Sequence, residues 1–594
     1  MTIVHILLAA LGIGFLIFIH EFGHYIAALR QGMTVEVFSI GFGPPVVSWK
    51  HKNVRWQVCI LPFGGYVKIA GMEGKGGVEP HQVEGGFYSK SAWSRIKVAL
   101  AGPFVNIAFA FLIFCVIWAL GGRERAFSQH TPTVGWVAPR SPFYEAGMRP
   151  GDLIEEINGK PFRSFEQLYT ETVLNKQPWT IRGKHTHDPS VTSTPFEWTA
   201  HFLAPLATAE RLKLIMQSIA PAQFLLSTTP PTESPMAASG LHARDRLIWA
   251  NGHFLFSAQE LHHALNARKV LLTILRDSKT RLAVLSTHKI GEYRLSEQQR
   301  GELEDFKYDA HVKTALANLS FIPYVVDAKG IVQERLQLSE GNSFSEDELK
   351  SGDRILAVDG HSVPSAQALL ASLQTPHVTM IVKMHDEASA ASSSQANALF
   401  QSEMESPALK AIIASIGTDH PIIERDGYRL LPSTPLLSFQ EMAWLQGKEH
   451  ALPGYGLGIH LHDLSVTYNP SPLTLCNYAV REMWRTVSAI FTGNLSPKWL
   501  AGPLGIVHVM EHSWAEGTKE AFFWLGLISL NLGIFNLLPL PILDGGHIGF
   551  SLWELITRRR ITAKTLERLI IPFVVLFIAF FIYLTYHDIL KLFN

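Results

Sequence analysis

Four long apolar runs dominate the hydrophobic pattern of the chain. A helix needs about 20 apolar residues to cross a hydrocarbon core of about 30 Å. Runs of that length are Ile3–Ala28, Val98–Leu120, Ala521–Pro541 and Leu569–Leu590. They predict a multi-pass α-helical membrane protein with four spans and a long region outside lipid, from about residue 121 to 519. The first run lacks a basic start, so we expect a retained span rather than a cleaved signal peptide.

Composition agrees with this pattern and excludes some classes of partner. Of 594 residues, 47% are hydrophobic and only 17% charged, which is apolar for a soluble protein. Lys+Arg and Asp+Glu are both 51, so no overall field favours nucleic acid. The three cysteines lie far apart without a CxxC pair, which predicts neither a disulfide framework nor a thiolate zinc site. Any metal would be held by His and carboxylate.

Basic residues indicate the orientation in the membrane. Lys and Arg in short loops beside spans favour the cytoplasmic side. They cluster between Arg30 and Lys97 and again between Arg558 and Arg568. Both loops should therefore be cytoplasmic, and the long middle region and both termini should lie on the opposite side.

The middle region contains an internal repeat. RPGDLIEEINGK begins at Arg149, HARDRLIWANGH at His242 and KSGDRILAVDGH at Lys350. Each stretch has an Asp, a short apolar strand and an Asn-Gly or Asp-Gly turn. The pattern resembles PDZ domains of bacterial proteases, and the first copy matches best: Arg244 replaces a glycine in the second, and the third lacks an upstream Ser-Pro.

PDZ domains bind extended peptides by adding a strand to a sheet edge. In the first copy we expect 134–137 to be that edge. Alternatively, the repeats are spacers or size-exclusion bodies above the membrane. Residues 228–233 and 387–397 are predicted to be exposed loops or linkers.

The chemistry-bearing motif lies inside the first apolar run. His20-Glu21-Phe22-Gly23-His24 is an HExxH sequence, and residues four apart on a helix share a face. Both imidazoles can then reach one zinc ion, with Glu21 beside it as general base. The alternative is three polar groups satisfied within a helix bundle.

A third ligand is expected from the third span. Pro539 and Pro541 break its helix and free backbone groups that lipid cannot satisfy, which suggests a wet cavity at that depth. Asp544 follows the break and is the predicted third ligand, although an Asp there could also be a helix N-cap. His547 is a rival ligand that ranks lower.

Together, HExxH and NxxPxPxLDG resemble the site-2 protease family of intramembrane zinc metalloproteases, family M50. Further stretches resemble its bacterial branch with inserted PDZ domains, the regulator-of-sigma-E protease group. These stretches are FSIGFGPP from Phe38, LPFGGYVKIAG from Leu61, AGPFVNIAFAF from Ala101 and LSPKWLAGPLGI from Leu495.

The resemblance implies that His20, His24 and Asp544 hold Zn²⁺ and that Glu21 is the general base. It also implies that Asn106, in a GxxxN pattern, packs the second span beside the site. Asn531 and Asn536 would help to hold substrate backbone beside Pro539 and Pro541. From the residues alone, buried asparagines in membrane helices more often form interhelical hydrogen bonds.

The implied function is regulated intramembrane proteolysis in a bacterial inner membrane, with the PDZ domains on the periplasmic side. Substrates would be single-span membrane proteins such as anti-sigma factors or remnant signal peptides, already trimmed by a site-1-type protease. The alternatives are a PDZ adaptor with a vestigial metal site, a tethered soluble zinc protease and a transporter; the last would need related halves.

Two more segments have predicted roles. Residues 35–69 resemble the family's membrane-reentrant β-hairpin, which would offer an edge to an unwound substrate; a plain soluble hairpin is the alternative. Residues 475–491 form an expected amphipathic helix, which either lies on the outer interface or packs against the last PDZ domain.

The predicted organisation follows from these elements. It consists of a first span with HExxH (1–29), a cytoplasmic-side β region (30–96), a second span (97–120), PDZ-like domains (121–215 and 216–290), a divergent third PDZ-like domain with a linker (291–435), a juxtamembrane region (436–519), a third span with PxPxLDG (520–548), a cytoplasmic loop (549–568) and a fourth span (569–594). The fold class is therefore a four-span helical membrane protein with inserted α+β or β PDZ-like extracytoplasmic domains.

Overall fold

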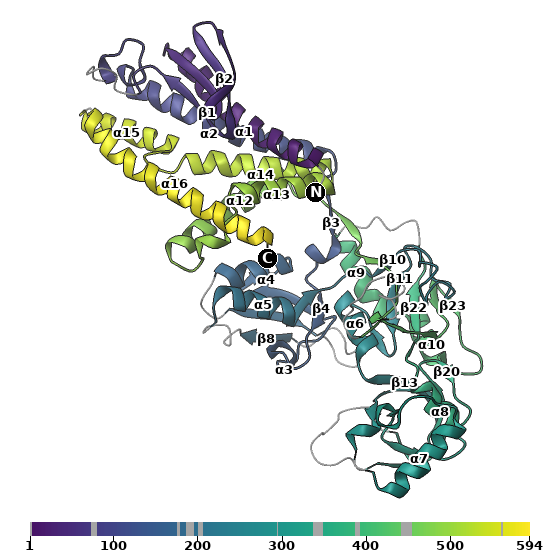
Figure 1. The fold of residues 1–594 in the computed structure, drawn as a ribbon. Helices are drawn as coiled ribbons and strands as arrows, with labels where there is room; N and C mark the ends of the chain where they lie inside the picture. Colours follow the sequence, from purple (N-terminus) through teal and green to yellow (C-terminus); the bar gives the residue numbers. More distant parts are fainter. Residues whose placement is uncertain are drawn as a thin grey trace. The chain divides into compact units, whose positions relative to one another are not determined.

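The computed structural model divides into two compact units, Met1–Arg123 with Tyr468–Asn594, and Glu124–Thr467. It describes residues 3–72, 80–174, 179–185, 195–199, 206–293, 295–336, 349–385, 393–440, 454–559 and 562–593. We call the first the helical unit and the second the repeat unit, and describe each by itself (Figure 1).

The helical unit is built around α1 (Ile3–Arg30), α2 (Ala92–Ala119) and α14 (Thr518–Asn536). α2 packs against both α1 and α14, and α13 (Pro503–Glu516) contacts α1, α14 and α16 (Ala563–Phe593). Aromatic and aliphatic side chains such as Leu16, Phe114 and Met510 form its buried core. The remaining long helices of this unit are α12 (Pro472–Phe491) and α15 (Asp544–Thr557).

Three described helices are long and apolar enough to cross a membrane: α1, α2 and the 565–591 part of α16. The predicted third span is present as α14, but this helix ends at Asn536 rather than Pro541 and is not one of the three. It carries Lys519 and Glu520 in its first turn, which lowers its hydropathy. The count of four spans therefore stays a prediction.

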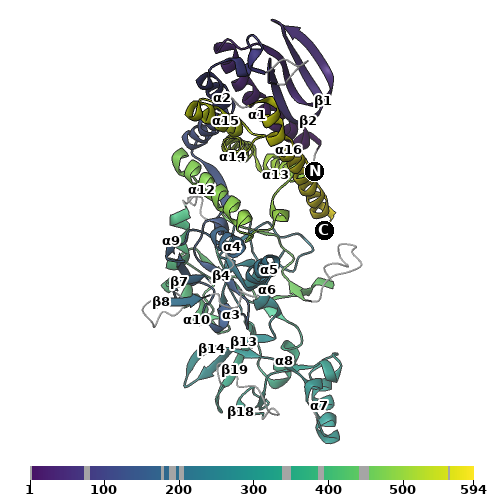
Figure 2. The same ribbon diagram turned by 90° about the vertical axis from the view of Figure 1, so that its left-hand side faces the viewer.

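Strands β1 (Val35–His51) and β2 (Val54–Ile69) form one long antiparallel hairpin in the helical unit, seen clearly in Figure 2. Lys52 and Asn53 turn the chain with φ angles of 45° and 63°, as a tight hairpin turn requires. Val46 and Ile60 toward the tip are more than 60% exposed. The predicted hairpin is confirmed, and its insertion into lipid remains a prediction.

The first core of the repeat unit matches one repeat. Its sheet has the order β6 (Lys160–Pro161), β5 (Leu153–Ile157), β7 (Thr180–Lys184), β8 (Pro195–Thr199). Helices α4 (Phe165–Leu174) and α5 (Thr208–Ser218) pack on each other, and Phe165, Leu168 and Trp179 are buried in the core.

Strand β4 (Val134–Val137) belongs to this core and pairs with β9 (Ile219–Pro221) on one side. On the other side, its first residue Val134 exchanges backbone hydrogen bonds with Gly151 and Asp152 at 2.7 and 2.8 Å. Val134 is therefore already paired on both sides, and a peptide-binding role for the rest of the 134–137 edge stays a prediction.

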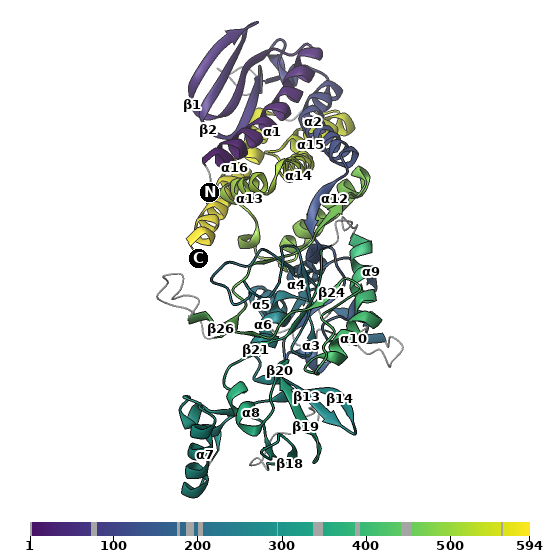
Figure 3. The ribbon, with the colours of Figure 1, turned by 90° about the vertical axis from the view of Figure 1, so that its right-hand side faces the viewer.

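The core of the third repeat is formed by residues that lie, in sequence, between the two parts of the second core. The second core joins Leu225–Leu265 with Val378–Leu457, and its strand β11 (Arg246–Ala250) pairs with β22 (Met380–Lys383). The third core runs from Val270 to Leu373 and lies between these two parts in sequence. Its strands β13 (Lys269–Arg276) and β14 (Lys279–Ser286) pair with each other, and β13 pairs with β19 (Arg354–Val358). Figure 3 shows these three strands side by side.

The predicted boundary at residue 290 therefore does not coincide with a boundary between cores. Each repeat places a helix and then a strand after its Asn-Gly or Asp-Gly turn. After the second repeat that strand is β13, which joins the third core; after the third repeat it is β22, which joins the second. Strand pairing is set by long-range packing, which a sequence repeat alone does not reveal.

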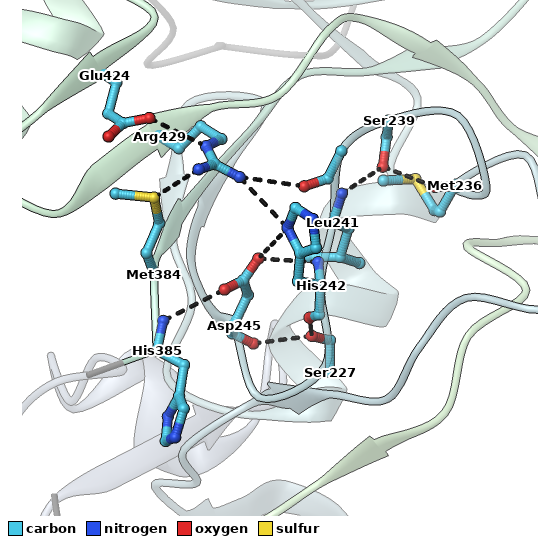
Figure 4. A network of polar contacts seen from close by, with 11 residues as sticks. Ser227, Met236, Ser239, Leu241, His242, Asp245, Met384, His385, Glu424 and Arg429 are labelled. Atoms are coloured by element: carbon cyan, nitrogen blue, oxygen red, sulfur yellow. Dashed lines mark hydrogen bonds and ion pairs between the residues drawn. The ribbon is translucent and has the colours of Figure 1, made fainter. Parts of the chain in front are cut away.

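The three repeats share a turn that is closed by an Asp side chain. In each, the Asp side chain accepts a hydrogen bond from the backbone N–H three residues earlier: Asp152 from Arg149, Asp245 from His242 and Asp353 from Lys350, at 2.7–2.9 Å. Figure 4 shows the second of these turns, where Asp245 also accepts from the His385 backbone and Arg429 reaches His242. The repeated Asp therefore fixes the turn before each strand.

Two local predictions have clear outcomes. The amphipathic helix expected over 475–491 is confirmed as α12, which begins at Pro472 with Ser471 as its N-cap. The linker expected over 387–397 is partly wrong, because α9 (Ser393–Met404) begins inside it and Ala396 is fully buried; residues 387–392 lie outside the described residues.

Candidate metal centre

Helix α1 brings His20 and His24 together. The two residues are one helical turn apart, and their Nε2 atoms lie 3.3 Å from each other. Both side chains are buried, with 7% and 8% of their surface exposed. Two ring nitrogens at this separation, on one face of one helix, can both bind the same metal ion.

Asp544 completes the group from the other end of the sequence. Its Oδ2 atom lies 3.2 Å from His20 Nε2 and 3.3 Å from His24 Nε2. Among the described residues, His20, His24 and Asp544 form the one group of His, Cys, Asp or Glu able to hold a metal, with ligand atoms within 4.8 Å of one another. The structure therefore brings together the three residues predicted as ligands.

The break between α14 and α15 positions Asp544. α14 ends at Asn536, the chain turns through Pro539 and Pro541, and Asp544 is the first residue of α15. A Cβ atom on Gly546 would lie 2.8 Å from Pro541 Cα, and one on Gly545 would meet the carbonyl groups of the preceding turn. The two glycines let α15 start close against that turn, so Asp544 reaches the histidines.

The Val98 carbonyl fixes which ring nitrogen of His24 is available to a metal. His24 Nδ1 lies 2.8 Å from the Val98 carbonyl oxygen, which can only accept, so Nδ1 carries a hydrogen. Nε2 is then the nitrogen available for a metal, and it faces Asp544 and His20. Gly102 makes room for it, because a Cβ there would lie 2.7 Å from His24 Cε1 and 2.8 Å from Cδ2.

His20 is bounded by two amides. Asn106 Nδ2 lies 3.2 Å from His20 Nδ1, and Asn536 Nδ2 lies 3.3 Å from Nε2. Asn106 Oδ1 is buried and without a hydrogen-bond partner among the described residues. Turning the Asn106 amide by 180° places that oxygen against Nδ1–H, which leaves the lone pair of Nε2 for a metal. Two neutral imidazoles and one carboxylate are a donor set that suits zinc.

The site opens into a cavity of about 1150 Å³ within the helical unit. His20, Glu21, His24, Asn536, Asp544 and His547 supply its polar wall, and residues of α1, α13, α14, α16 and the β1–β2 hairpin supply most of the rest. β2 runs against Glu21: a Cβ on Gly65 would lie 3.0 Å from Glu21 Cγ, and the Val67 backbone is hydrogen-bonded to Glu21. Glu21 is thus fixed beside the three ligand-type atoms.

The other predicted residues divide into two groups. Asn106 and Asn536 contact His20, while Asn531 is half-buried on α14 and does not line the cavity. His547 lines the cavity, and its ring packs edge-on against Phe87 at 5.8 Å instead of joining the three-residue group. Sequence reasoning missed Gly102 and the Val98 carbonyl. Gly102 is the glycine of the GxxxN pattern, so that pattern could have indicated its role.

Comparison with known proteins gives a consistent result over the whole chain. The family model described as Peptidase family M50 matches residues 8–581. A relative from Chlamydia trachomatis is 34% identical over 629 aligned residues, and one from Chlamydia pneumoniae is 35% identical over 631, each covering 100% of both chains. One from Thermotoga maritima is 24% identical and covers 99% of both. All three are named as zinc metalloproteases.

Proposed function

This chain belongs to peptidase family M50, and we propose that it is a zinc endopeptidase that cleaves single-span membrane proteins within the bilayer. The names of its relatives support zinc as the metal. The observation that carries the proposal is the convergence of His20, His24 and Asp544 at the wall of a cavity that Glu21 also lines.

In this proposal His20, His24 and Asp544 would hold a zinc ion, which would supply a Lewis acid able to lower the pKa of a bound water molecule to about 7. Glu21, fixed by the Val67 backbone, takes a proton from the water that attacks the peptide carbonyl, and later returns it to the leaving amine. The Asn106 amide orients His20 through Nδ1.

The substrate class follows from the cavity and the hairpin. A peptide bond inside a helix is shielded, so cleavage requires local unwinding. The apolar cavity wall suits a hydrophobic segment, and the β2 backbone beside Glu21 offers groups that an unwound strand can pair with. We propose anti-sigma factors or remnant signal peptides as substrates, made accessible by an earlier cut from a site-1-type protease.

The remaining part of the proposal concerns location. The protein resides in a bacterial inner membrane, with the repeat unit on the periplasmic side as a size filter or a recognition module. The basic residues of the two short loops support this orientation.

The test uses purified full-length protein, a tagged single-span substrate and zinc analysis. We expect Glu21→Gln to keep its zinc and to lose about 100- to 10,000-fold in cleavage rate, the range for a general base. Asp544→Asn should lose more than about 100-fold in zinc affinity, the upper end for outer-sphere partners. His547→Gln is the matched control, because it alters the same cavity wall and should retain zinc. Cleavage surviving in Glu21→Gln would refute the mechanism, and full zinc retention in Asp544→Asn would refute the ligand assignment.

A further inference from the structure

The start of α12 lies against the end of α2 in the helical unit. Asn469 Nδ2 donates a hydrogen bond of 3.1 Å to the Trp118 carbonyl oxygen. Gly122 has a φ of 83°, and a Cβ there would lie 2.5 Å from the Tyr468 carbonyl oxygen. The segment that leads into α12 is therefore laid directly on the last turn of α2.

Each of these two helices carries one cysteine near the contact. Cys115 lies three residues before Trp118, one turn back on α2, and Cys476 is the fifth residue of α12. Both are half-buried, and Cys476 packs against the apolar core that contains Ile117 and Leu475.

Helices α2 and α12 are in contact, so the two cysteines lie on packed elements of the same unit. Burial raises the pKa of Cys476, and Cys115 raises it further, which agrees with this placement. Helices in contact lie about 8–10 Å apart, a spacing at which facing residues can reach the Cβ separation of about 3.5–4.5 Å that a disulfide needs.

We propose that Cys115 and Cys476 form a disulfide that fixes the start of α12 to the end of α2. This rests on the proposed function for one point, the orientation that puts this end of α2 on the oxidising side of the membrane. The sequence pattern predicted no disulfide framework, because the cysteines are far apart in the sequence without a CxxC pair; the fold brings the two helices that carry Cys115 and Cys476 into contact.

The reaction is thiol–disulfide exchange with a disulfide oxidant. One cysteine thiolate attacks a sulfur of the oxidant and releases its first thiol. The other thiolate then attacks the mixed disulfide, forms the Cys115–Cys476 bond and releases the second thiol. The two cysteines lose two electrons and two protons, and the oxidant is reduced to two thiols.

The bond would link the two parts of the helical unit close to the points where the chain leaves it and returns to it. The chain leaves the helical unit after Arg123 and returns at Tyr468, so both connections lie between Cys115 and Cys476 in sequence. α12 also contacts α14, the helix that ends at the metal centre. It exposes Leu473, Trp484 and Phe491, each more than 60% accessible, so these side chains do not hold α12 to the rest of the unit.

The test counts thiols in the full-length Glu21→Gln variant, so that the result does not depend on cleavage. The protein is prepared without reductant, treated with oxidised glutathione, denatured, alkylated and mapped by mass spectrometry. We expect the number of free thiols to fall from three to one, with peptides of Cys115 and Cys476 joined and Cys59 free. Cys59 is the internal control, because it is buried in β2 beside Ser39 and Gln57.

Two variants keep the result unambiguous. Cys59→Ser should retain the linked peptides, and Cys115→Ser should have two free thiols and no bond within the chain. Three free thiols in the oxidised protein, or a bond that includes Cys59 or joins two chains, would overturn the proposal. Zinc-dependent cleavage by Cys115→Ser would show that the proposed function stands without the bond.

Discussion

Gly102 offers the sharpest test of how the two first helices build the metal centre. It lies on α2 where that helix crosses α1, and its missing side chain leaves space for the His24 ring. A Cβ would lie 2.7 Å from Cε1 and 2.8 Å from Cδ2 of that ring, whereas ordinary contact begins near 3.4 Å. Gly102→Ala must therefore displace His24 or α2 by roughly 1 Å, because the rigid ring cannot yield within itself.

The expected cost falls on metal binding. A displacement of about 1 Å costs about 100-fold in a well-placed reaction, and altered support of a ligand costs about 10- to 100-fold in metal affinity. We expect zinc affinity to fall about 10- to 100-fold, which is about 1.4–2.8 kcal/mol. The folded state should otherwise persist, since Ala favours a helix over Gly by up to about 1 kcal/mol.

The assay is competition for zinc against a chelator of known affinity, with cleavage measured at saturating zinc. Gly549→Ala is the matched control: it is also a helical glycine near the site, on α15, but a Cβ there meets nothing within 4 Å. Its zinc affinity should stay within about twofold of the wild type, because a surface change away from such contacts is usually worth less than about 0.5 kcal/mol. If Gly102→Ala binds zinc as tightly as Gly549→Ala, the account of the α1–α2 crossing is wrong.

Three further changes test other parts of the fold. Arg123→Ala should lower the free energy of unfolding in detergent by about 3–5 kcal/mol, because it removes the charged partner of the buried Glu520 carboxylate, whose two oxygens accept from Arg123 Nη1 at 2.7 and 2.8 Å. Arg123→Met with Glu520→Gln should recover part of the loss. Asp588→Ala should cost about 1–3 kcal/mol and speed amide exchange at the start of α13, since that carboxylate accepts the Gly502 and Gly505 N–H groups; normal exchange there would contradict it. Burial raises the pKa of Asp359 to about 7, so the folded state holds a proton that the unfolded state releases near pH 4, and stability should fall by roughly 1.4 kcal/mol per pH unit between pH 4 and 7. Asp359→Asn should flatten that decline in urea unfolding followed against pH, and an unchanged slope would refute the assignment.

The metal centre was largely predictable because its rules are local. His20 and His24 share a face by helical periodicity alone, and the proline break pointed to Asp544 because lipid leaves few other reasons for broken backbone. The residues that position the ligands were harder to predict from the sequence. That Gly102 faces His24, and that Val98 fixes its tautomer, depends on how α1 and α2 cross, which no spacing along one helix determines.

The repeat unit shows the opposite case. The repeated Asp and the following strand were visible in the sequence, and they do form equivalent turns. The partner of each strand was not visible. β13 and β22 are both short and apolar, and either could pair with β11 by pattern alone. For the same reason the partner of β4 was not visible, since β9 lies more than 80 residues later in the sequence.

The nested order has a consequence for folding. The third core spans residues 270–373 and can form from one continuous segment of chain. The second core needs β22 beside β11, so it must wait until residues 380–383 are present, and closing that loop costs chain entropy until the third core has shortened it. A compact third core brings the ends of the inserted segment together, which lowers the cost of pairing β22 with β11. The two repeats are therefore coupled in order of formation, and a destabilised third core should also weaken the second, although the two cores share none of their buried residues.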